Sequence, residues 1–239
     1  MIYNLPRKKK AASYPVKGDL IELDLDGQGA KDYRVLKISG SVAQVMAMYD
    51  DLSSVYNSST STTTTFGSTT AQKYENSTLD TYLNATWYNT LTSAAKAAIV
   101  SENVVQHCYM YYDEPNTPNT PTYTYQYQYN WSDSDYENAN DVGNVTVGNR
   151  NVFALDLKDI FDYFDKVCIT SNELMTMFWN STANVSEYLW LRSSSADDSG
   201  TAWLVDGAYG LLNLNVVDNS GVVRPTLNLD LSKIPYTLK

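Results

Sequence analysis

The sequence predicts an α+β protein in which antiparallel sheets are flanked by helices. Apolar and polar residues alternate over residues 18–48 and again over 227–231, which is the period of half-buried strands. Between these stretches, apolar residues recur at helical spacing after Asp156 and after Thr170. The chain has 239 residues, 43% of them hydrophobic, which is enough to bury a core.

Residues 1–17 are predicted to be a basic arm and residues 18–239 a single domain. The first ten residues hold four cations and no acid, and no apolar stretch follows that would make a signal peptide or a membrane helix. The whole chain has 17 Lys and Arg against 27 Asp and Glu, a formal charge of −10. An acidic body repels nucleic acid and anionic membranes, so neither is an expected partner.

The first third of the domain is predicted to be a β meander followed by a loop. Strands are expected at Leu20–Leu25, Tyr33–Ile38 and Val42–Met48, with glycine-containing turns between them. Residues 53–70 are rich in Ser and Thr and offer little apolar surface to offset the entropy of ordering. They are predicted to form a loop.

Four helices are predicted where a capping residue precedes apolar residues at helical spacing. The last two are expected to be amphipathic core helices. The predicted starts are Thr78 before Leu79–Leu83, Thr92 or Ser93 before Ala94–Val100, Asp156 before Leu157, Ile160, Phe161 and Phe164, and Thr170 with Glu173 before Leu174, Met177 and Phe178.

Residues 111–150 are predicted to be an insertion rich in Tyr and Asn. Over residues 122–129 tyrosine occupies every second position, and period two places these side chains on one strand face. They either cover the core or form a secondary binding surface, because tyrosine gives large contact area at low entropic cost. The four residues are Tyr123, Tyr125, Tyr127 and Tyr129.

The segment from Tyr188 to Leu231 carries most of the functional signal. Apolar runs frame it at both ends. The small polar segments 193–199, 206–207 and 218–221 are predicted loops between short strands around 203–205 and 211–217, and the segments displayed to a ligand are 193–199, 206–210 and 213–220. Polar and aromatic residues of these loops are expected to form one continuous exposed ligand-binding face. Its predicted members are Ser195, Asp197, Asp198, Thr201, Trp203, Asp206, Tyr209, Asn213, Asn215 and Asn219.

Two features of this face depend on strand geometry. Period two puts Asn213 and Asn215 on one side and sends Leu212, Leu214 and Val216 to the core. Trp203 and Tyr209 are the candidate aromatic anchors. An alternative makes Trp203 a core residue, because Val205 would share its face.

Arg192 and Arg224 are predicted to be scaffold residues. Each lies within an apolar run, where only a paired guanidinium is tolerable.

The residues offer no catalytic or cofactor signature. His107 is the only histidine, and its apolar neighbours favour a satisfied core residue over a ligand or a base. Cys108 and Cys168 are expected to be buried free thiols. No phosphate loop, nucleophile elbow or Cys/His cluster occurs, so no enzyme activity, metal or cofactor is expected.

The C-terminal segment resembles a known family. WLRS at 190–193, then Ala202-Trp203 with Val205 and Gly207, and the terminal VRP run are similar to the end of C-type-lectin-like, formylglycine-generating-enzyme-like domains. The match is with versions from gut bacteria and phages, including proteins diversified by retroelements. This resemblance implies a C-type-lectin-like fold. Formylglycine generation is not carried over, because no cysteine follows Cys168.

The resemblance implies a non-enzymatic ligand-binding protein of the receptor-binding or adhesin type, on a phage tail or a bacterial cell surface after cytoplasmic synthesis. Its partner would be a cell-surface protein or glycan, and the basic arm would contact other virion proteins. An alternative is a structural virion or surface protein that only mediates assembly. Whether the chain forms a homo-oligomer is left open.

A calcium-dependent glycan-binding lectin is a further alternative. Glu114-Pro115-Asn116 spells the mannose-type triplet of such lectins. The triplet lies upstream of the terminal strands, and Ser132 stands where a ligating Asn is expected. The residues therefore favour a chance match.

Overall fold

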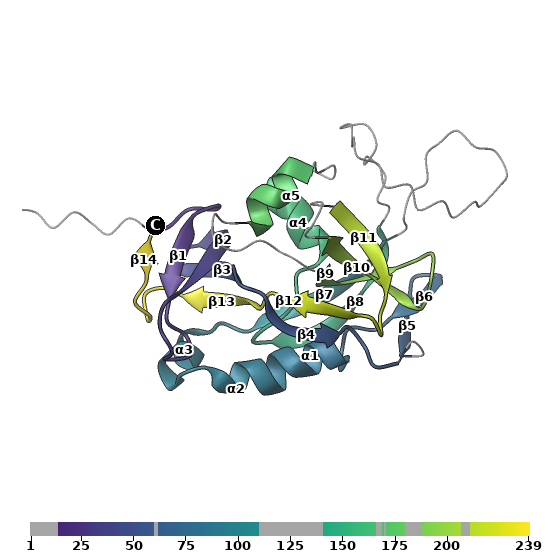
Figure 1. Ribbon diagram of the computed structural model, residues 1–239, viewed down its shortest axis with the longest axis horizontal. Helices are drawn as coiled ribbons and strands as arrows, with labels where there is room; N and C mark the ends of the chain where they lie inside the picture. Colours follow the sequence, from purple (N-terminus) through teal and green to yellow (C-terminus); the bar gives the residue numbers. More distant parts are fainter. Residues whose placement is uncertain are drawn as a thin grey trace, which may run out of the picture.

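The computed structural model describes residues 14–59, 62–109, 141–165, 169, 171–179, 188–206 and 211–239. Its architecture is mostly antiparallel sheet with a few short helices, which confirms the predicted α+β class. Helices α1–α3 cover one side of the sheets, and α4 and α5 lie on the opposite side (Figure 1).

A five-stranded sheet contains the predicted meander. Glycines with positive φ make its turns, at Gly27 (φ 75°) and Gly40 (φ 62°). The last strand of the chain pairs with the first, with Ile21 opposite Leu238. The strand order is β13 (Thr226–Asp230), β3 (Val42–Ala47), β2 (Lys31–Ser39), β1 (Leu20–Leu23) and β14 (Thr237–Leu238).

A seven-stranded sheet is centred on β9. This strand pairs antiparallel with β10, and parallel with β12 at Leu189 and with β7 at Ser194. Strand β8 completes a hairpin with β7. The members are β11 (Leu211–Val216), β10 (Thr201–Asp206), β9 (Tyr188–Ser195), β12 (Ser220–Val223), β4 (Asp51–Val55), β7 (Glu102–Tyr109) and β8 (Asp141–Arg150).

The loop predicted over residues 53–70 is wrong. Strand β4 begins at Asp51, and a hairpin of β5 (Thr63–Phe66) and β6 (Thr69–Gln72) follows. The few apolar residues here, Tyr56 and Phe66, are fully buried and tie the segment to the core. Backbone pairing is indifferent to side-chain polarity, so a Ser/Thr-rich segment forms strands once its rare apolar residues are buried.

One predicted helix start is shifted by a residue. Ser77 caps α1 (Thr78–Thr81) by accepting from Asp80 N at 3.1 Å, whereas the Thr78 hydroxyl accepts from Ser58 N. The chain continues through a π-helical stretch, η1 (Tyr82–Trp87), into α2 (Tyr88–Thr90). The prediction that Thr92 caps the next helix, α3 (Ser93–Ala98), is confirmed.

The two later helices occur as predicted. Asp156 caps α4 (Leu157–Phe164), and Asp159 completes a capping box. Helix α5 spans Ser171–Phe178, and its predicted cap Thr170 lies outside the described residues. No helix in the described part of the chain is long and apolar enough to cross a membrane.

Two hydrophobic clusters fill the space on either side of the sheets. One contains Trp87 of η1 together with Trp190. The other contains Ile160 of α4 and Met177 of α5, together with Leu191 and Trp203. Trp203 is therefore a core residue, as the alternative interpretation of the sequence proposed.

Candidate functional site

The run of serines at the end of β9 is buried strand. Residues 193–195 were predicted to be part of a loop, and this is wrong because each hydroxyl has a partner inside the protein. Ser193 accepts from Leu157 N at 2.8 Å, Ser194 donates to the carbonyl of Gln72, and Ser195 accepts from Asp197 N at 3.2 Å. The exposed loop begins only after Ser195, at residue 196.

Arg192 holds β9 to its neighbours from within the core. Its guanidinium donates to the carbonyl oxygens of Val105 (2.7 Å) and Ala154 (2.6 Å) and to the Asp159 carboxylate (2.6 Å). Burial disfavours the charged guanidinium, but Asp159 and then Asp156 outweigh it and raise the pKa of Arg192. The predicted scaffold position of Arg192 is confirmed.

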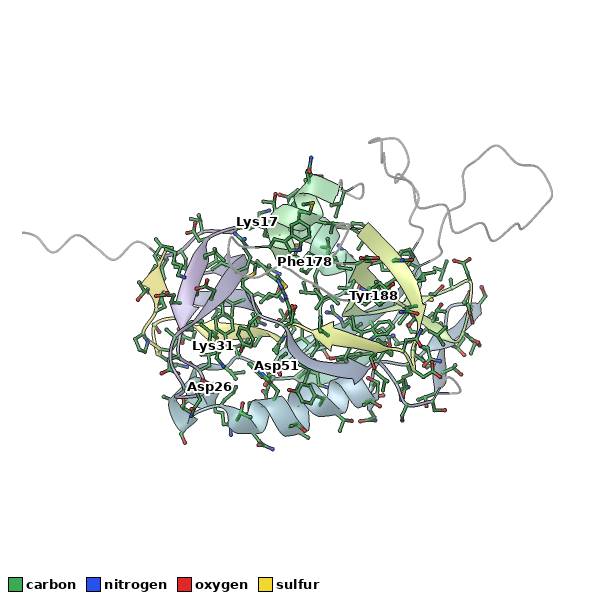
Figure 2. The ribbon with its side chains drawn as sticks, in the orientation of Figure 1. Lys17, Asp26, Lys31, Asp51, Phe178 and Tyr188 are labelled. Carbon is green, nitrogen blue, oxygen red and sulfur yellow. The ribbon has the colours of Figure 1, made fainter. Side chains whose placement is uncertain are left out.

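Arg224 makes a second buried anchor. Its Nε donates to Asp50 at 2.8 Å, and another guanidinium nitrogen donates to the carbonyl of Phe178. Phe178 is the last residue of α5 (labelled in Figure 2), so Arg224 fixes the C-terminal end of that helix over the sheet. Burial lowers the pKa of Arg224 against the opposing effect of Asp50.

His107 lies between two carboxylates rather than in an apolar pocket. Its Nδ1 is 3.3 Å from the Asp156 carboxylate and its Nε2 is 3.8 Å from that of Asp141. Burial opposes the imidazolium, but Asp156 and then Asp141 outweigh it and raise the pKa of His107. Burial would raise the pKa of Asp156, yet Arg192 and His107 hold it below its usual value.

A buried network of hydrogen bonds holds the loop at residues 196–200 to the core. Gln106 donates to the Gln72 carbonyl (2.9 Å) and the Tyr56 hydroxyl (3.2 Å), and accepts from Tyr74 N (2.8 Å). Gln72 in turn donates to the carbonyl of Ser199 at 2.6 Å. Sequence reasoning missed these residues. The available signal was the alternation of β7, which places Gln106 on the buried face between Val104 and Cys108.

Five segments meet at one end of the molecule, which we call the loop end. Val217 N donates to the Gly200 carbonyl (3.1 Å), and Ala196 N donates to that of Tyr109 (2.9 Å). Ala196 also packs against the cluster around Phe66. Figure 1 shows the β5–β6 hairpin far from β1 and β14. The loop end comprises residues 196–200, 217–220 and 66–69, with Tyr109 and Asp141.

The loop end is anionic. Its exposed residues include carboxylates, and none of its described residues is a Lys, Arg or His. The segment 110–140, which holds Tyr123, Tyr125, Tyr127 and Tyr129, lies outside the described residues. The described residues on either side of it, Tyr109 and Asp141, are paired across β7 and β8. The exposed carboxylates are those of Asp141, Asp197, Asp198 and Asp218.

The predicted continuous exposed face does not exist in full. Ser195, Thr201, Trp203 and Asp206 are 0%, 8%, 5% and 5% exposed. The reason is that β9 and β10 are interior strands of the sheet, and both faces of β10 are covered. Tyr209 lies outside the described residues.

Five of the ten predicted residues remain accessible. Asp197, Asp198 and Asn219 are exposed in the loop end, and Asn213 and Asn215 are half-buried. Asn215 and Asn219 are joined by a 2.6 Å hydrogen bond between their side chains. The ligand-binding role of the ten residues stays a prediction.

Strand β11 alternates largely as predicted. Asn213 and Asn215 stand opposite Leu204 and Ala202, while Leu212 and Leu214 turn to the second hydrophobic cluster. Val216 was expected in the core, but it is 40% exposed because it lies where β11 leaves the cluster.

The cysteines and the possible metal ligands of the sequence remain to be placed. Cys108 is a buried free thiol, as predicted, and burial raises its pKa to about 12. Cys168 and the Glu114-Pro115-Asn116 triplet lie outside the described residues. Within the described part of the chain, no group of three or more His, Cys, Asp and Glu could hold a metal ion.

Comparison with protein families assigns the chain to a family. The model of a family described as a domain of unknown function, DUF6273, matches residues 52–231. This match covers more than half of the sequence, so the chain belongs to that family. Neither the curated proteins nor the solved structures contain a match.

Proposed function

We propose that this protein is a non-enzymatic ligand-binding module, and that the loop end binds the ligand. The observation that carries the proposal is that the loop at residues 196–200 is held by buried hydrogen bonds and still exposes two carboxylates. Gln72, Gln106 and Ser194 hold the base of this loop with buried hydrogen bonds, while Asp197 and Asp198 are exposed above it. Binding to a rigidly held loop loses little conformational entropy.

The composition of segment 110–140 also supports a binding role. The described residues that flank it in the sequence, Tyr109 and Asp141, are paired with each other, and Tyr109 accepts from Ala196 N. The composition of the segment is that of a binding surface, because aromatic side chains supply contact area and Asn and Ser supply adaptable hydrogen bonds. Loops on a rigid scaffold are a common place for binding residues.

The finer assignments rest on the sequence resemblance. The two large, mostly antiparallel sheets with helices on both sides are compatible with a C-type-lectin-like fold. With that fold, the module is of the receptor-binding or adhesin type, on a phage tail or a bacterial surface. Its ligand is then a cell-surface protein or glycan.

Binding measurements with matched variants test this proposal. The Asp197→Asn, Asp198→Asn double variant removes two charges from the loop end. The control, Asp24→Asn with Asp162→Asn, removes two charges elsewhere, and Asn at 24 keeps an acceptor for Gly27 N. Asp24 lies two residues before Asp26, which Figure 2 labels near β1 and far from the β5–β6 hairpin, and Asp162 lies on α4.

Each protein is titrated against arrayed surface glycans and intact bacterial cells. We expect the wild type and the control to bind equally, and the loop variant at least about tenfold more weakly, which is about 1.4 kcal/mol. Equal binding by all three proteins, or no binding by the wild type on either panel, contradicts the proposal.

A further inference from the structure

The outer edge of β11 carries backbone groups that face away from the sheet. Among the described strands, β11 pairs only with β10, and Figure 1 shows it at the border of the molecule. Val217 N points inward, to the Gly200 carbonyl. Because N–H groups alternate in direction along a strand, those of Leu214 and Val216 point outward.

Two asparagine side chains occupy these outward N–H groups. The Oδ1 of Asn213 accepts from Leu214 N at 2.8 Å, and that of Asn215 accepts from Val216 N at 2.9 Å. Asn219 donates to the same oxygen of Asn215 at 2.6 Å and fixes its orientation. Two of the donors that a neighbouring strand would need, Leu214 N and Val216 N, are therefore already satisfied within β11.

Apart from these amides, β11 has the properties of a strand that pairs with another chain. Its sequence, Leu-Leu-Asn-Leu-Asn-Val, contains no charge and no proline. Leu214 is half-buried, and Val216 is 40% exposed at the end of the strand. Edge strands of this kind pair readily unless something blocks them, and natural proteins commonly block them with polar or charged side chains.

We propose that the outer edge of β11 is a strand-pairing surface for a second copy of this chain, and that Asn213 and Asn215 hold it closed. A second copy fits because two β11 strands related by a two-fold axis meet antiparallel, oppose no like charges and cover both copies of Val216. The asparagines thus have a role that does not depend on the ligand site.

The Asn213→Val, Asn215→Val variant tests this closure. Valine favours the strand and cannot accept a hydrogen bond, so Leu214 N and Val216 N become available. Light scattering coupled to size exclusion should show a monomeric wild type and a variant of twice its mass. The control, Asn103→Val with Asn149→Val, adds the same apolar surface at a cross-strand pair on β7 and β8 and should stay monomeric.

A third substitution identifies the edge that pairs. Val216→Pro, added to the valine variant, removes one outward N–H, and proline is tolerated where an edge N–H faces away from the sheet. It should return the variant to a monomer, with circular dichroism checking the fold. If the double variant does not fold, the single variant Asn215→Val replaces it in this test. The single variant should dimerise, but more weakly than expected for the double variant.

Four results overturn the proposal. These are a folded valine variant that stays monomeric, a control that dimerises equally, a dimer that survives the proline, and a wild type that already dimerises as strongly.

Discussion

Residues 192–195 and 197–199 are near neighbours of similar polarity, yet they have opposite roles. Arg192 and the serines after it are buried, and their polar groups bond to partners inside the protein. Asp197 and Asp198 are exposed a few residues later. The difference shows that polar composition alone does not mark a binding loop. What separates the two sets is burial, because β9 is an interior strand of the sheet whereas residues 197–199 lie in an exposed turn.

The largest effect is expected from Arg192→Ala. It removes the cation that pairs with buried Asp156 and the donor to the carbonyls of Val105 and Ala154, and breaking a buried pair costs about 3–5 kcal/mol. Denaturant unfolding measures the loss. Lys158→Ala, which breaks an exposed pair with Asp162, is the control and should change little. A small effect of Arg192→Ala would contradict the scaffold role.

A smaller loss is expected from Gln106→Met, which preserves shape but removes the centre of the polar network. The buried N–H of Tyr74 then lacks its acceptor, which alone costs about 1–3 kcal/mol. Chemical denaturation should show this loss, and hydrogen exchange should become faster in residues 196–200. If the loop keeps its wild-type exchange rates, the network does not support it. Asn103→Met, on the exposed face of the same strand, is the control.

The smallest effect is expected from pH. The folded pKa of His107 is raised, so its stabilisation is complete below about pH 6.5 and is lost as pH rises through the folded pKa. The pKa of Asp156 is lowered, so its stabilisation is present above about pH 4 and is lost as pH falls through the folded pKa. Asp141 and Arg192 complete the charges around the imidazole.

Melting temperatures at pH 5.5 and 8.5 check the His107 contribution. The wild type should melt at a higher temperature at pH 5.5 than His107→Gln does, and the difference between the two proteins should shrink at pH 8.5. A difference that is the same at both pH values would show that the charge on His107 does not stabilise the fold.

Local patterns predicted much of this fold. The meander and the start of α4 after Asp156 depend on neighbouring residues, and both are confirmed. The scaffold position of Arg192 also followed from its apolar neighbours. Patterns of this kind suffice because their physical causes lie within one element or one turn.

The sequence-based predictions failed where contacts with distant segments determine whether a residue is buried. Ser193 is in a strand because Leu157, 36 residues away, donates to it. Trp203 is buried because α4 and α5 cover its face of β10. Gln106 was overlooked for the same reason, since its partners Gln72 and Tyr56 come from other strands and loops. The sequence patterns therefore indicated the loop of the candidate site but not the buried residues that hold this loop.

Hydrogen–deuterium exchange with and without a partner found on the glycan or cell panels tests the central claim most directly. If the loop end binds the ligand, exchange should slow in residues 196–200 and 217–220 and stay unchanged in the turn at residues 24–29. Slower exchange in the turn at 24–29, with none at 196–200 or 217–220, would contradict the account.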